Sequence, residues 1–201
     1  ASLHLIGKDI VRFHAVIWPA MLMSAGLPLP RRVFGHGFLT NRGEKMSKST
    51  GNVLEPIAMT EKYGLDAFRY FFLREIPFGS DGSYSHEAII GRLNADLAND
   101  LGNLAQRSLS MVNKNCDAKV PANNGTFADD APLLDSTYGL VNFARSHMYG
   151  FALHAILNDI WKVVGDTNRY FAGQAPWALR KTDLARMETV LWTTAEVLRV
   201  V

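Results

Sequence analysis

A short polar segment holds the two lysines of this sequence that are best placed for chemistry. Lys45 and Lys48 lie three positions apart, with Met46 between them and Gly51 shortly after. Two ammonium groups on a loop of small residues can bind one polyanion together, and a glycine lets a ligand approach the backbone. The residue order excludes a Walker A loop, which needs Gly-x4-Gly-Lys-Ser/Thr. The pair therefore suits a phosphate or pyrophosphate group whose charge grows in a transition state.

The charge distribution points the same way. The chain has 201 residues and a net charge of +2, but residues 1–74 carry ten basic and five acidic side chains, and residues 75–201 carry eleven and fourteen. A local positive excess attracts phosphates, although charge taken alone favours a solvated basic loop. The single cysteine, Cys116, excludes an internal disulfide and a zinc site of clustered thiolates.

The elements that must position the lysines begin with a strand over Leu3–Ile6 that ends at Gly7. A helix is expected from Asp9, and Pro19 should kink or divide it because proline lacks a backbone donor. No segment approaches the roughly 18 consecutive apolar residues of a membrane span. The inner face of this helix is predicted from three- and four-residue spacing to be Ile10, Phe13, Ile17 and Met21.

The middle of the chain, from Arg31 to Ser85, reads as short elements separated by glycine and proline. The expected elements are a small hairpin over Val33–Leu39 with a turn at Thr40–Gly43, a helix from Pro56 to Gly64, a helix over Asp66–Glu75, and a connection over Phe78–Ser85.

Beyond Ser85 the sequence predicts helices joined as an antiparallel bundle. These are a long helix to about Asn113, helices over 134–148 and 151–172, a turn at Pro176-Trp177, and a last helix from Asp183. The apolar face of the long helix is predicted to be Leu93, Leu97, Leu101, Leu104 and Leu109. On the same helix, Asn99, Asn103 and Arg107 recur every four residues and form a polar stripe suited to the edges of bases.

The string Lys45-Met46-Ser47-Lys48-Ser49 matches the KMSKS signature of class I aminoacyl-tRNA synthetases. Further blocks resemble the methionyl-tRNA synthetases among them, and these are Gly7–His14, Trp18–Met21, His36–Leu39, Asn99–Arg107 and Ala175–Trp177. The resemblance covers almost the whole chain and implies an α-rich mixed fold. It implies the end of a Rossmann-like catalytic domain over 1–32, a KMSKS and stem-contact region over 33–85, and a truncated helical anticodon-binding bundle over 86–201.

The resemblance also implies an ATP site. Lys48, and secondarily Lys45, would be the catalytic residues that hold the ATP phosphates while the adenylate forms. Asp9 would bind the ribose, with helix capping as its alternative role, and His36 would lie near the adenine. The full ATP-binding set implied is Gly7, Lys8, Asp9, His36, Lys45, Ser47 and Lys48.

Methionine and tRNA would be bound by other residues. Ile10 and His14 stand four apart on one helix face, and the resemblance implies that they belong to the amino-acid pocket; a core isoleucine beside a capped or exposed histidine is the alternative. The anticodon-binding residues implied are Asn99, Asn103, Arg107, Pro176 and Trp177, with the indole as a platform for an unstacked base.

The function implied is that of a cytoplasmic enzyme that activates methionine with ATP and Mg²⁺ and transfers it to tRNA(Met), with no zinc site in this chain and no membrane partner. The family's His-Ile-Gly-His signature is absent from the sequence. The chain alone is therefore expected to be inactive, with the missing N-terminal half of the same enzyme as its partner. The alternatives are a non-catalytic tRNA-binding module, or a class I synthetase for valine, isoleucine, leucine or cysteine.

Overall fold

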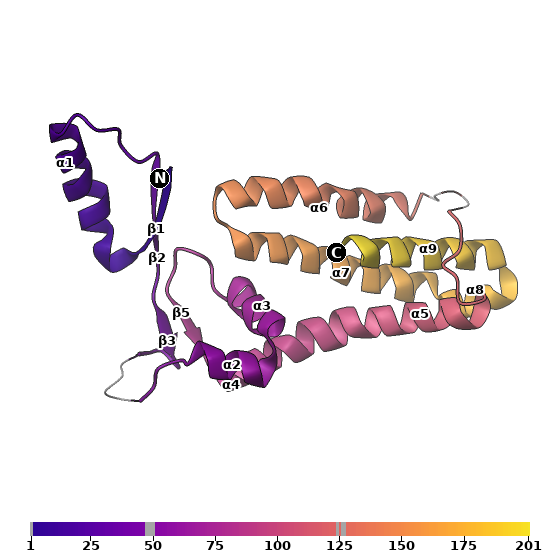
Figure 1. Ribbon diagram of the computed structural model, residues 1–201. Coiled ribbons are helices and arrows are strands. Elements are labelled where there is room, and N and C mark those ends of the chain that lie inside the picture. Colours follow the sequence, from indigo (N-terminus) through magenta and orange to yellow (C-terminus); the bar gives the residue numbers. More distant parts are fainter. Residues whose placement is uncertain (1, 47–50, 124, 126–127) are drawn as a thin grey trace. The chain divides into compact units, whose positions relative to one another are not determined.

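A computed structural model of the protein is rich in helix and has two small sheets among the residues it describes (Figure 1). Those residues are 2–46, 51–123, 125 and 128–201. The chain forms two compact units, unit 1 with Ala1–Ile89 and Ala152–His154, and unit 2 with Ile90–Phe151 and Ala155–Val201. In the part of the chain so described, no helix is long and apolar enough to cross a membrane. The expectation of an α-rich mixed chain is confirmed.

Unit 1 contains all the described strands. They are β1 (Leu3–Gly7), β2 (Arg32–His36), β3 (Leu39–Asn41), β4 (Glu44–Lys45) and β5 (Gly82–Tyr84). The helical segments of this part are η1 (Lys8–Ile10), η2 (Phe13–Ile17), α1 (Trp18–Ser24), α2 (Pro56–Tyr63), α3 (Leu65–Glu75) and α4 (His86–Arg92), whose last residues enter unit 2.

Strands β1 and β2 run parallel, with Gly7 opposite His36 at the last position of both strands. Parallel neighbours need a crossover connection, and the helical run from η1 to α1 supplies it (Figure 1). The predicted strand and the helix after it are confirmed. Pro19 lies in the first turn of α1, directly after the π-helical segment η2, so the helix changes type where the proline removes a donor.

The apolar face predicted to be the inner face of this N-terminal helix is not buried. Its members are 37% to 64% exposed, and they are Ile10, Phe13, Ile17 and Met21. The sheet beside the helix has two strands, which is too little surface to cover the face. The prediction of a buried inner face is therefore wrong for the described structure.

The second sheet has the strand order β4-β3-β5. Strands β3 and β4 form an antiparallel hairpin around Arg42 and Gly43, whose φ angles of 51° and 83° match the turns favoured in two-residue hairpins. The backbone N–H of Arg42 donates to the carbonyl oxygen of Tyr84 at 3.1 Å, and that of Gly43 donates to Ser83 Oγ at 2.9 Å. The turn was predicted correctly.

Two predictions for this region are wrong because strand pairing connects distant residues. Residues Val33–His36 belong to β2 and pair with β1, so they are not an arm of the hairpin. The connection Phe78–Ser85 is not wholly irregular, since it contains β5, which pairs in parallel with β3. In contrast, helix α2 begins at Pro56 and ends before Gly64, whose φ of 84° breaks the helix as predicted.

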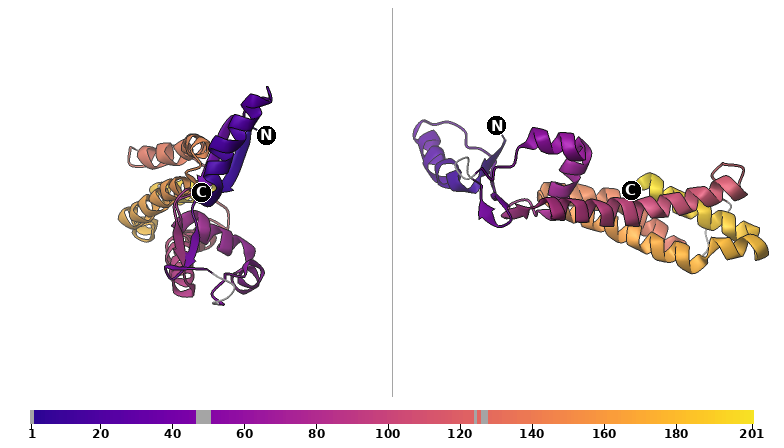
Figure 2. Two further views of the ribbon diagram at one scale, coloured as in Figure 1. Left: turned by 90° about the vertical axis from the view of Figure 1, so that its left-hand side faces the viewer. Right: turned by 90° about the horizontal axis from the view of Figure 1, so that it is seen from below.

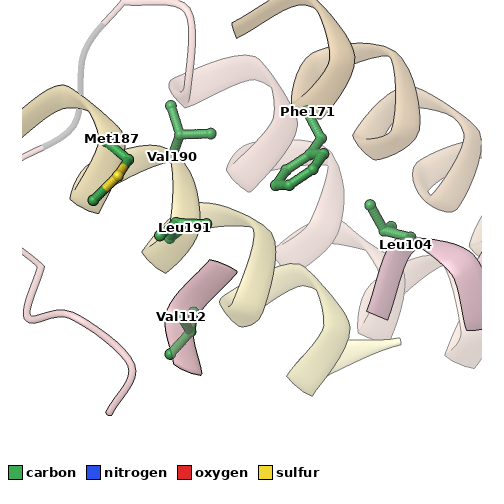
Figure 3. Close-up of a cluster of buried hydrophobic side chains, with 6 residues drawn as sticks. All are labelled: Leu104, Val112, Phe171, Met187, Val190 and Leu191. Carbon is green, nitrogen blue, oxygen red and sulfur yellow. The ribbon is translucent and has the colours of Figure 1, made fainter. Parts of the chain in front are cut away.

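Unit 2 is helical throughout its regular elements. After the end of α4 come η3 (Leu93–Gly102), α5 (Asn103–Asn115), α6 (Ala131–Tyr149), α7 (Leu153–Gln174), α8 (Pro176–Thr182) and α9 (Leu184–Val200). The long helices of unit 2 run side by side in Figure 1 and in the further views of Figure 2. A cluster of buried side chains from α5, α7 and α9 forms the core between them, and Figure 3 draws Leu104, Val112, Phe171, Met187, Val190 and Leu191.

The predicted apolar face of the long helix fails at one end. Leu104 is fully buried, but Leu109 is 50% exposed, and the buried positions that follow Leu104 are Ser108 and Val112. The reason is the spacing within α5, which is a regular α-helix: Leu109 follows Leu104 by five positions, a step that turns about 140° away from the buried face. Ser108 and Val112, four and eight positions after Leu104, stay on that face.

The link between α7 and α9 also differs from the prediction. The predicted turn at Pro176-Trp177 is the first turn of the short helix α8, and the chain reverses at Ala175, which has a φ of 46°. Pro176 is buried there at a position where its missing N–H costs nothing. The last helix begins as predicted, since the Asp183 side chain accepts a bond from the Arg186 N–H at 2.9 Å.

A buried ion pair joins the start of α6 to α9. Both nitrogens of the Arg186 fork donate to Asp130, Nη1 to Oδ2 at 2.7 Å and Nη2 to Oδ1 at 2.8 Å. Tyr170 donates its hydroxyl to Asp130 Oδ1 at 2.6 Å, and Gln174 Oε1 accepts from Arg186 Nε at 3.2 Å. Burial, followed by the hydrogen bond to Asp130, raises the pKa of Tyr170 well above its ordinary value.

Candidate functional site

The ends of the two parallel strands gather several of the predicted ATP-binding residues. Gly7 and His36 are paired in register, and Lys8 and Asp9 follow Gly7 directly. Ligands of open α/β sheets bind beyond the carboxyl ends of the strands, which is where these residues lie. A Cβ at position 7 would lie 2.5 Å from Asp9 Oδ1, so a larger residue there would displace this carboxylate. The N-cap residue of η1 is Gly7, and Asp9 lies in the first turn.

Lys8 is held by an acidic residue that the sequence did not single out. Its ammonium donates to both carboxylate oxygens of Asp81, at 2.7 and 2.6 Å, and lies 4.9 Å from the centre of the Phe38 ring. Asp81 Oδ1 also accepts from the backbone N–H of Phe38 at 2.8 Å. The bond from Lys8, and then the one from Phe38, lower the pKa of Asp81. Lys8 thus carries its own counter-ion in this structure.

The predicted adenine residue, His36, is half-buried and fixed in orientation. Its Nδ1 lies 3.0 Å from the carbonyl oxygen of Gly37, and its ring stacks on Phe78 with 6.1 Å between ring centres. Phe78 also stacks on Phe34 at 5.0 Å. Any side chain at Gly37 would collide with the backbone of Ser80, so the close approach of this loop requires a glycine.

The described residues that flank the signature segment are joined by hydrogen bonds. Lys45 closes strand β4, while Ser47 and Lys48 lie outside the described residues. The side-chain amide of Asn52 donates through Nδ2 to the carbonyl oxygen of Lys45 at 3.2 Å. The backbone carbonyl oxygen of Asn52 accepts from Asn41 Nδ2 at 3.2 Å. The N–H of Leu54 lies 3.3 Å from the Met46 sulfur. The described residues before and after positions 47–50 are therefore bonded to one another.

One cavity of about 620 Å³ borders both the loop and the strand end. His36, Lys45 and Met46 contribute to its wall, and most of the remaining lining is apolar, including Phe72 and Phe78. The cavity brings the predicted adenine residue and the first signature lysine to one site. The predicted ATP residues that the structure describes are thus in one part of unit 1.

The predicted methionine residues are only partly brought together. His14 lines a cavity of about 310 Å³ with His4, Phe13 and Trp18. Ile10 is not part of that lining; its carbonyl oxygen lies 3.1 Å from His14 Nδ1 and so orients the imidazole. The Trp18 ring makes T-shaped contacts with both histidine rings, with 4.8 Å between ring centres for His4 and 6.3 Å for His14. His4 Nε2 is buried and lacks a hydrogen-bond partner among the described residues.

The predicted RNA-binding residues lie in unit 2. Asn99, Asn103 and Arg107 are all exposed, as is Trp177, which is 50% exposed. Arg107 Nε donates to the carbonyl oxygen of Asn103 at 3.2 Å, which holds the guanidinium along its own helix. Pro176 is buried and is the first residue of α8, directly before Trp177.

Metal ligands are not grouped in the described structure. Over residues 2–46, 51–123, 125 and 128–201, no three His, Cys, Asp or Glu side chains lie close enough to hold an ion. Burial, and secondarily the charges of Glu188 and Asp117, raise the pKa of the Cys116 thiol, which keeps it protonated and a poor ligand.

A family model described as tRNA synthetases class I (M) matches residues 1–109, more than half of the chain. The chain belongs to this synthetase family. The match includes the strand end, the signature loop and the first part of the long helix, so the resemblance to methionyl-tRNA synthetases drawn from the motifs is confirmed.

Curated relatives extend the similarity to the whole chain. The methionine–tRNA ligase of Brucella suis is 65% identical over 199 residues, 99% of this chain and 39% of the relative. That of Mycobacterium tuberculosis is 60% identical over 205 residues, 100% of this chain and 39% of the relative. The chain therefore spans about two fifths of the length of the curated relatives that it matches.

A solved structure agrees with the synthetase fold. Mycobacterium tuberculosis methionyl-tRNA synthetase in complex with methionyl-adenylate has a TM-score of 0.93 and 58% identity, covering 100% of this chain and 40% of that one. Its free-state structure gives a TM-score of 0.89 at 54% identity, with 39% of that chain covered.

Three residues with clear structural roles were not predicted from the sequence. Asp81 stands in a Gly-Ser-Asp-Gly stretch typical of a loop, Asn52 follows the signature, and Phe171 is one of many aromatic residues. The contacts of Asp81 and Phe171 cross 73 and 64 positions, to Lys8 and Arg107. Only Asn52, which is adjacent to the signature and polar, carried a local signal that could have found it.

Proposed function

We propose that the chain is part of a methionine–tRNA ligase, which condenses methionine with ATP to methionyl-adenylate and transfers methionine to tRNA(Met). The observation that carries the proposal is the 58% identity and TM-score of 0.93 with a synthetase whose structure holds methionyl-adenylate. The 65% identical ligase of Brucella suis supports the same reading. Because this chain spans two fifths of such relatives, the activity is assigned to a longer protein that contains it.

The proposed domain organisation follows the motifs. Residues 1–32 are assigned to the end of a Rossmann-like catalytic domain, and the parallel pair β1–β2 with its helical crossover supports this. Residues 33–85 form the KMSKS and stem-contact region. Residues 86–201 form the helical anticodon-binding bundle, supported by the shared core of α5, α7 and α9.

ATP is assigned to the strand-end region of unit 1. Gly7 lets the nucleotide approach, Asp9 binds the ribose, and His36 contacts the adenine, which its fixed ring orientation supports. Lys8, Lys45, Ser47 and Lys48 bind the phosphates, so these side chains stabilise the charge that develops on pyrophosphate as it leaves. Mg²⁺ is expected to enter with the ATP phosphates, the usual way in which this ion is held.

The amino-acid pocket is assigned to the region of His14. A thioether is polarizable and a weak acceptor, so aromatic rings and an imidazole edge suit it. The cavity walled by Phe13, His14 and Trp18 supports this assignment, and Ile10 contributes through the carbonyl oxygen that orients His14. No side chain of this chain is needed as a nucleophile or base, because adenylate formation depends on positioning and charge stabilisation.

The anticodon is assigned to Asn99, Asn103, Arg107 and Trp177, which are exposed, together with the buried Pro176 that precedes the indole. The half-exposed indole on a short rigid helix supports a stacking role, because unstacked bases bind aromatic platforms. Asn and Arg present the donors and acceptors that base edges require. The +2 net charge of the chain gives little bulk attraction, so recognition depends on a few placed side chains.

The test is methionine-dependent exchange of pyrophosphate into ATP, measured with this chain and with the longer protein. We expect exchange only from the longer protein, because the catalytic half with the His-Ile-Gly-His signature is its other part, and we expect it to act in the cytoplasm, where tRNA is charged. Appreciable exchange by the 201-residue chain alone would contradict the proposed division. Faster charging of tRNA with an anticodon other than CAU would contradict methionine specificity.

A second function, RNA binding without catalysis, applies to the chain taken alone. The observation that favours it is that the predicted RNA-binding residues all lie in unit 2, away in sequence from the ATP residues of unit 1. Binding of a CAU-loop RNA hairpin by this chain, in the absence of exchange, is the expected result.

A further inference from the structure

A buried aromatic ring joins two of the proposed anticodon-binding residues. Phe171 on α7 is 1% exposed and belongs to the core cluster drawn in Figure 3. The Arg107 guanidinium lies 5.6 Å from the centre of this ring. The Trp177 indole meets the same ring at 6.1 Å between centres and an interplanar angle of 63°. A cation and an indole from two different helices therefore share one immobile aromatic partner.

Asn168, three residues before Phe171 on α7, fixes the guanidinium from another direction. Its Oδ1 accepts from Arg107 Nη2 at 2.8 Å. Its Nδ2 donates to the carbonyl oxygens of Asp100 at 3.1 Å and Val164 at 3.2 Å. Because the amide nitrogen is committed to two carbonyls, the amide oxygen faces Arg107 and no other orientation satisfies all three groups.

The indole is fixed independently. Trp177 follows the buried Pro176, and Ala175 before it has a φ of 46°, so the backbone at the start of α8 has little freedom. The residue before that, Gln174, accepts a bond from Arg186 Nε at 3.2 Å. The edge contact with Phe171 then sets the direction of the indole, while half of its surface remains open to solvent.

We propose that Phe171, assisted by Asn168, is a positioning residue that holds the Arg107 guanidinium and the Trp177 indole at a fixed spacing, so that both engage the same stretch of unstacked anticodon bases. This rests on the proposed function, in which Arg107 and Trp177 contact the anticodon. A free arginine on a surface samples many rotamers, and holding it in its bound arrangement before RNA arrives raises affinity and discrimination. Phe171 itself is buried and does not touch the RNA.

The test is binding of an RNA hairpin by the 201-residue chain, with a CAU loop and with a loop of changed sequence. Phe171→Leu removes the ring and keeps an apolar side chain, and Met187→Leu is its control in the same buried cluster. Asn168→Ala removes the acceptor, with the exposed Asn142→Ala as its control. We expect each test variant to lose about five- to tenfold in affinity for the CAU loop and part of its preference over the changed loop. The controls should retain both.

A double-mutant cycle separates positioning from general loosening of the core. In a background carrying Arg107→Ala and Trp177→Ala, Phe171→Leu should cause no further loss, because the groups that it positions are gone. An additional loss of CAU-loop affinity from Phe171→Leu in that background would overturn the proposal. So would a loss of affinity from Phe171→Leu in the wild-type background that is no greater than the loss from Met187→Leu. If Phe171→Leu fails to fold by circular dichroism, Asn168→Ala against its control decides the outcome on the same terms.

The failure of the proposed function has a different signature. If Arg107→Ala and Trp177→Ala themselves bind the CAU loop as tightly as the wild-type chain does, the anticodon assignment is wrong and this proposal fails with it. If those two variants lose affinity and the Phe171 and Asn168 variants behave like their controls, the anticodon assignment stands and only the positioning role is overturned.

Discussion

The ammonium of Lys8 lies 2.7 and 2.6 Å from the two carboxylate oxygens of Asp81, a residue 73 positions later in the chain. The pair joins the end of β1 to the loop before β5, and Asp81 holds that loop to Phe38 through a further bond of 2.8 Å. The lysine assigned to the ATP phosphates thus also has a structural partner, and the two roles predict different behaviour on substitution.

Lys8→Ala in the longer enzyme is expected to raise the KM for ATP in pyrophosphate exchange by about tenfold or more, because a charge-assisted hydrogen bond contributes roughly 1.5–3 kcal/mol. Asp81→Ala should change this KM by less than about threefold, since the exposed pair itself contributes little. Steady-state exchange at varied ATP measures both. Equal increases for the two variants would show that Lys8 acts through the loop and not on the nucleotide.

Lys48→Ala in the longer enzyme should lower the rate of adenylate formation by about a hundredfold, the effect of losing one group that stabilises transition-state charge. Methionine binding should change far less, because the lysine is assigned to the phosphates. Rapid-quench measurement of adenylate formation and equilibrium binding of methionine separate the two, with Lys114→Ala as the control lysine. Equal losses in both measurements would contradict a transition-state role.

Trp177→Ala should weaken tRNA charging and leave pyrophosphate exchange unchanged. Stacking of one base on an aromatic side chain contributes about 1–3 kcal/mol, so kcat/KM for tRNA should fall roughly five- to hundredfold. Tyr149→Ala is the matched control, because this aromatic residue of unit 2 is 82% exposed and is assigned no contact with RNA. A parallel fall in exchange would instead mark Trp177 as a residue needed for folding.

Asp130→Ala should destabilise the chain by about 3–5 kcal/mol, because it leaves the Arg186 guanidinium buried without its carboxylate. Asp130 is fully buried, whereas the neighbouring Asp129 is exposed. Asp129→Ala is therefore the control and should change the free energy of unfolding by less than about 1 kcal/mol. Urea unfolding followed by circular dichroism gives both values. Similar losses for the two variants would mean that burial of the ion pair has little importance.

Tyr170 predicts how stability changes at alkaline pH. Its pKa is raised by burial and by the hydrogen bond to Asp130, so the unfolded chain loses this proton near pH 10 while the folded chain keeps it. The contribution is therefore complete below about pH 10 and declines above it, by up to about 1.4 kcal/mol per pH unit.

Tyr170→Phe should accordingly show a shallower decline in the free energy of unfolding above about pH 10 than the wild-type chain does. Urea unfolding over a series of alkaline buffers measures the difference, and Tyr149→Phe serves as the exposed control. Parallel curves for Tyr170→Phe and the wild-type chain would show that Tyr170 does not remain protonated in the folded state.

The parts of the fold that were predictable depend on neighbours in sequence. Pro56, Gly64 and Asp183 mark helix ends through backbone freedom or capping, and each ends or begins a helix as expected. The parallel pairing of Val33–His36 with β1 was missed because it depends on a strand some 30 positions away. The exposure of Leu109 was missed because Leu109 follows the buried Leu104 by five positions, a step that leaves the buried face of an α-helix.

The candidate site likewise contains residues that could be predicted from local motifs and residues that could not. Gly7, Asp9 and His36 were identified from motifs, and the structure brings their backbone positions to adjacent strand ends. The partners that fix them are distant in sequence: Asp81 holds Lys8, and Phe78 stacks on His36. Motifs name the groups that contact a ligand, whereas the groups that orient them emerge only from tertiary packing.

The buried pair of Asp130 and Arg186 also has a consequence for the order of folding. It closes a stretch of 56 positions in a chain whose single cysteine cannot form an internal disulfide, so it serves as a non-covalent cross-link. Two charges gain from each other only after water has left their surroundings, and that happens once the helices around them have packed. The contact should therefore form after the rate-limiting step, so that it slows unfolding and leaves the folding rate nearly unchanged.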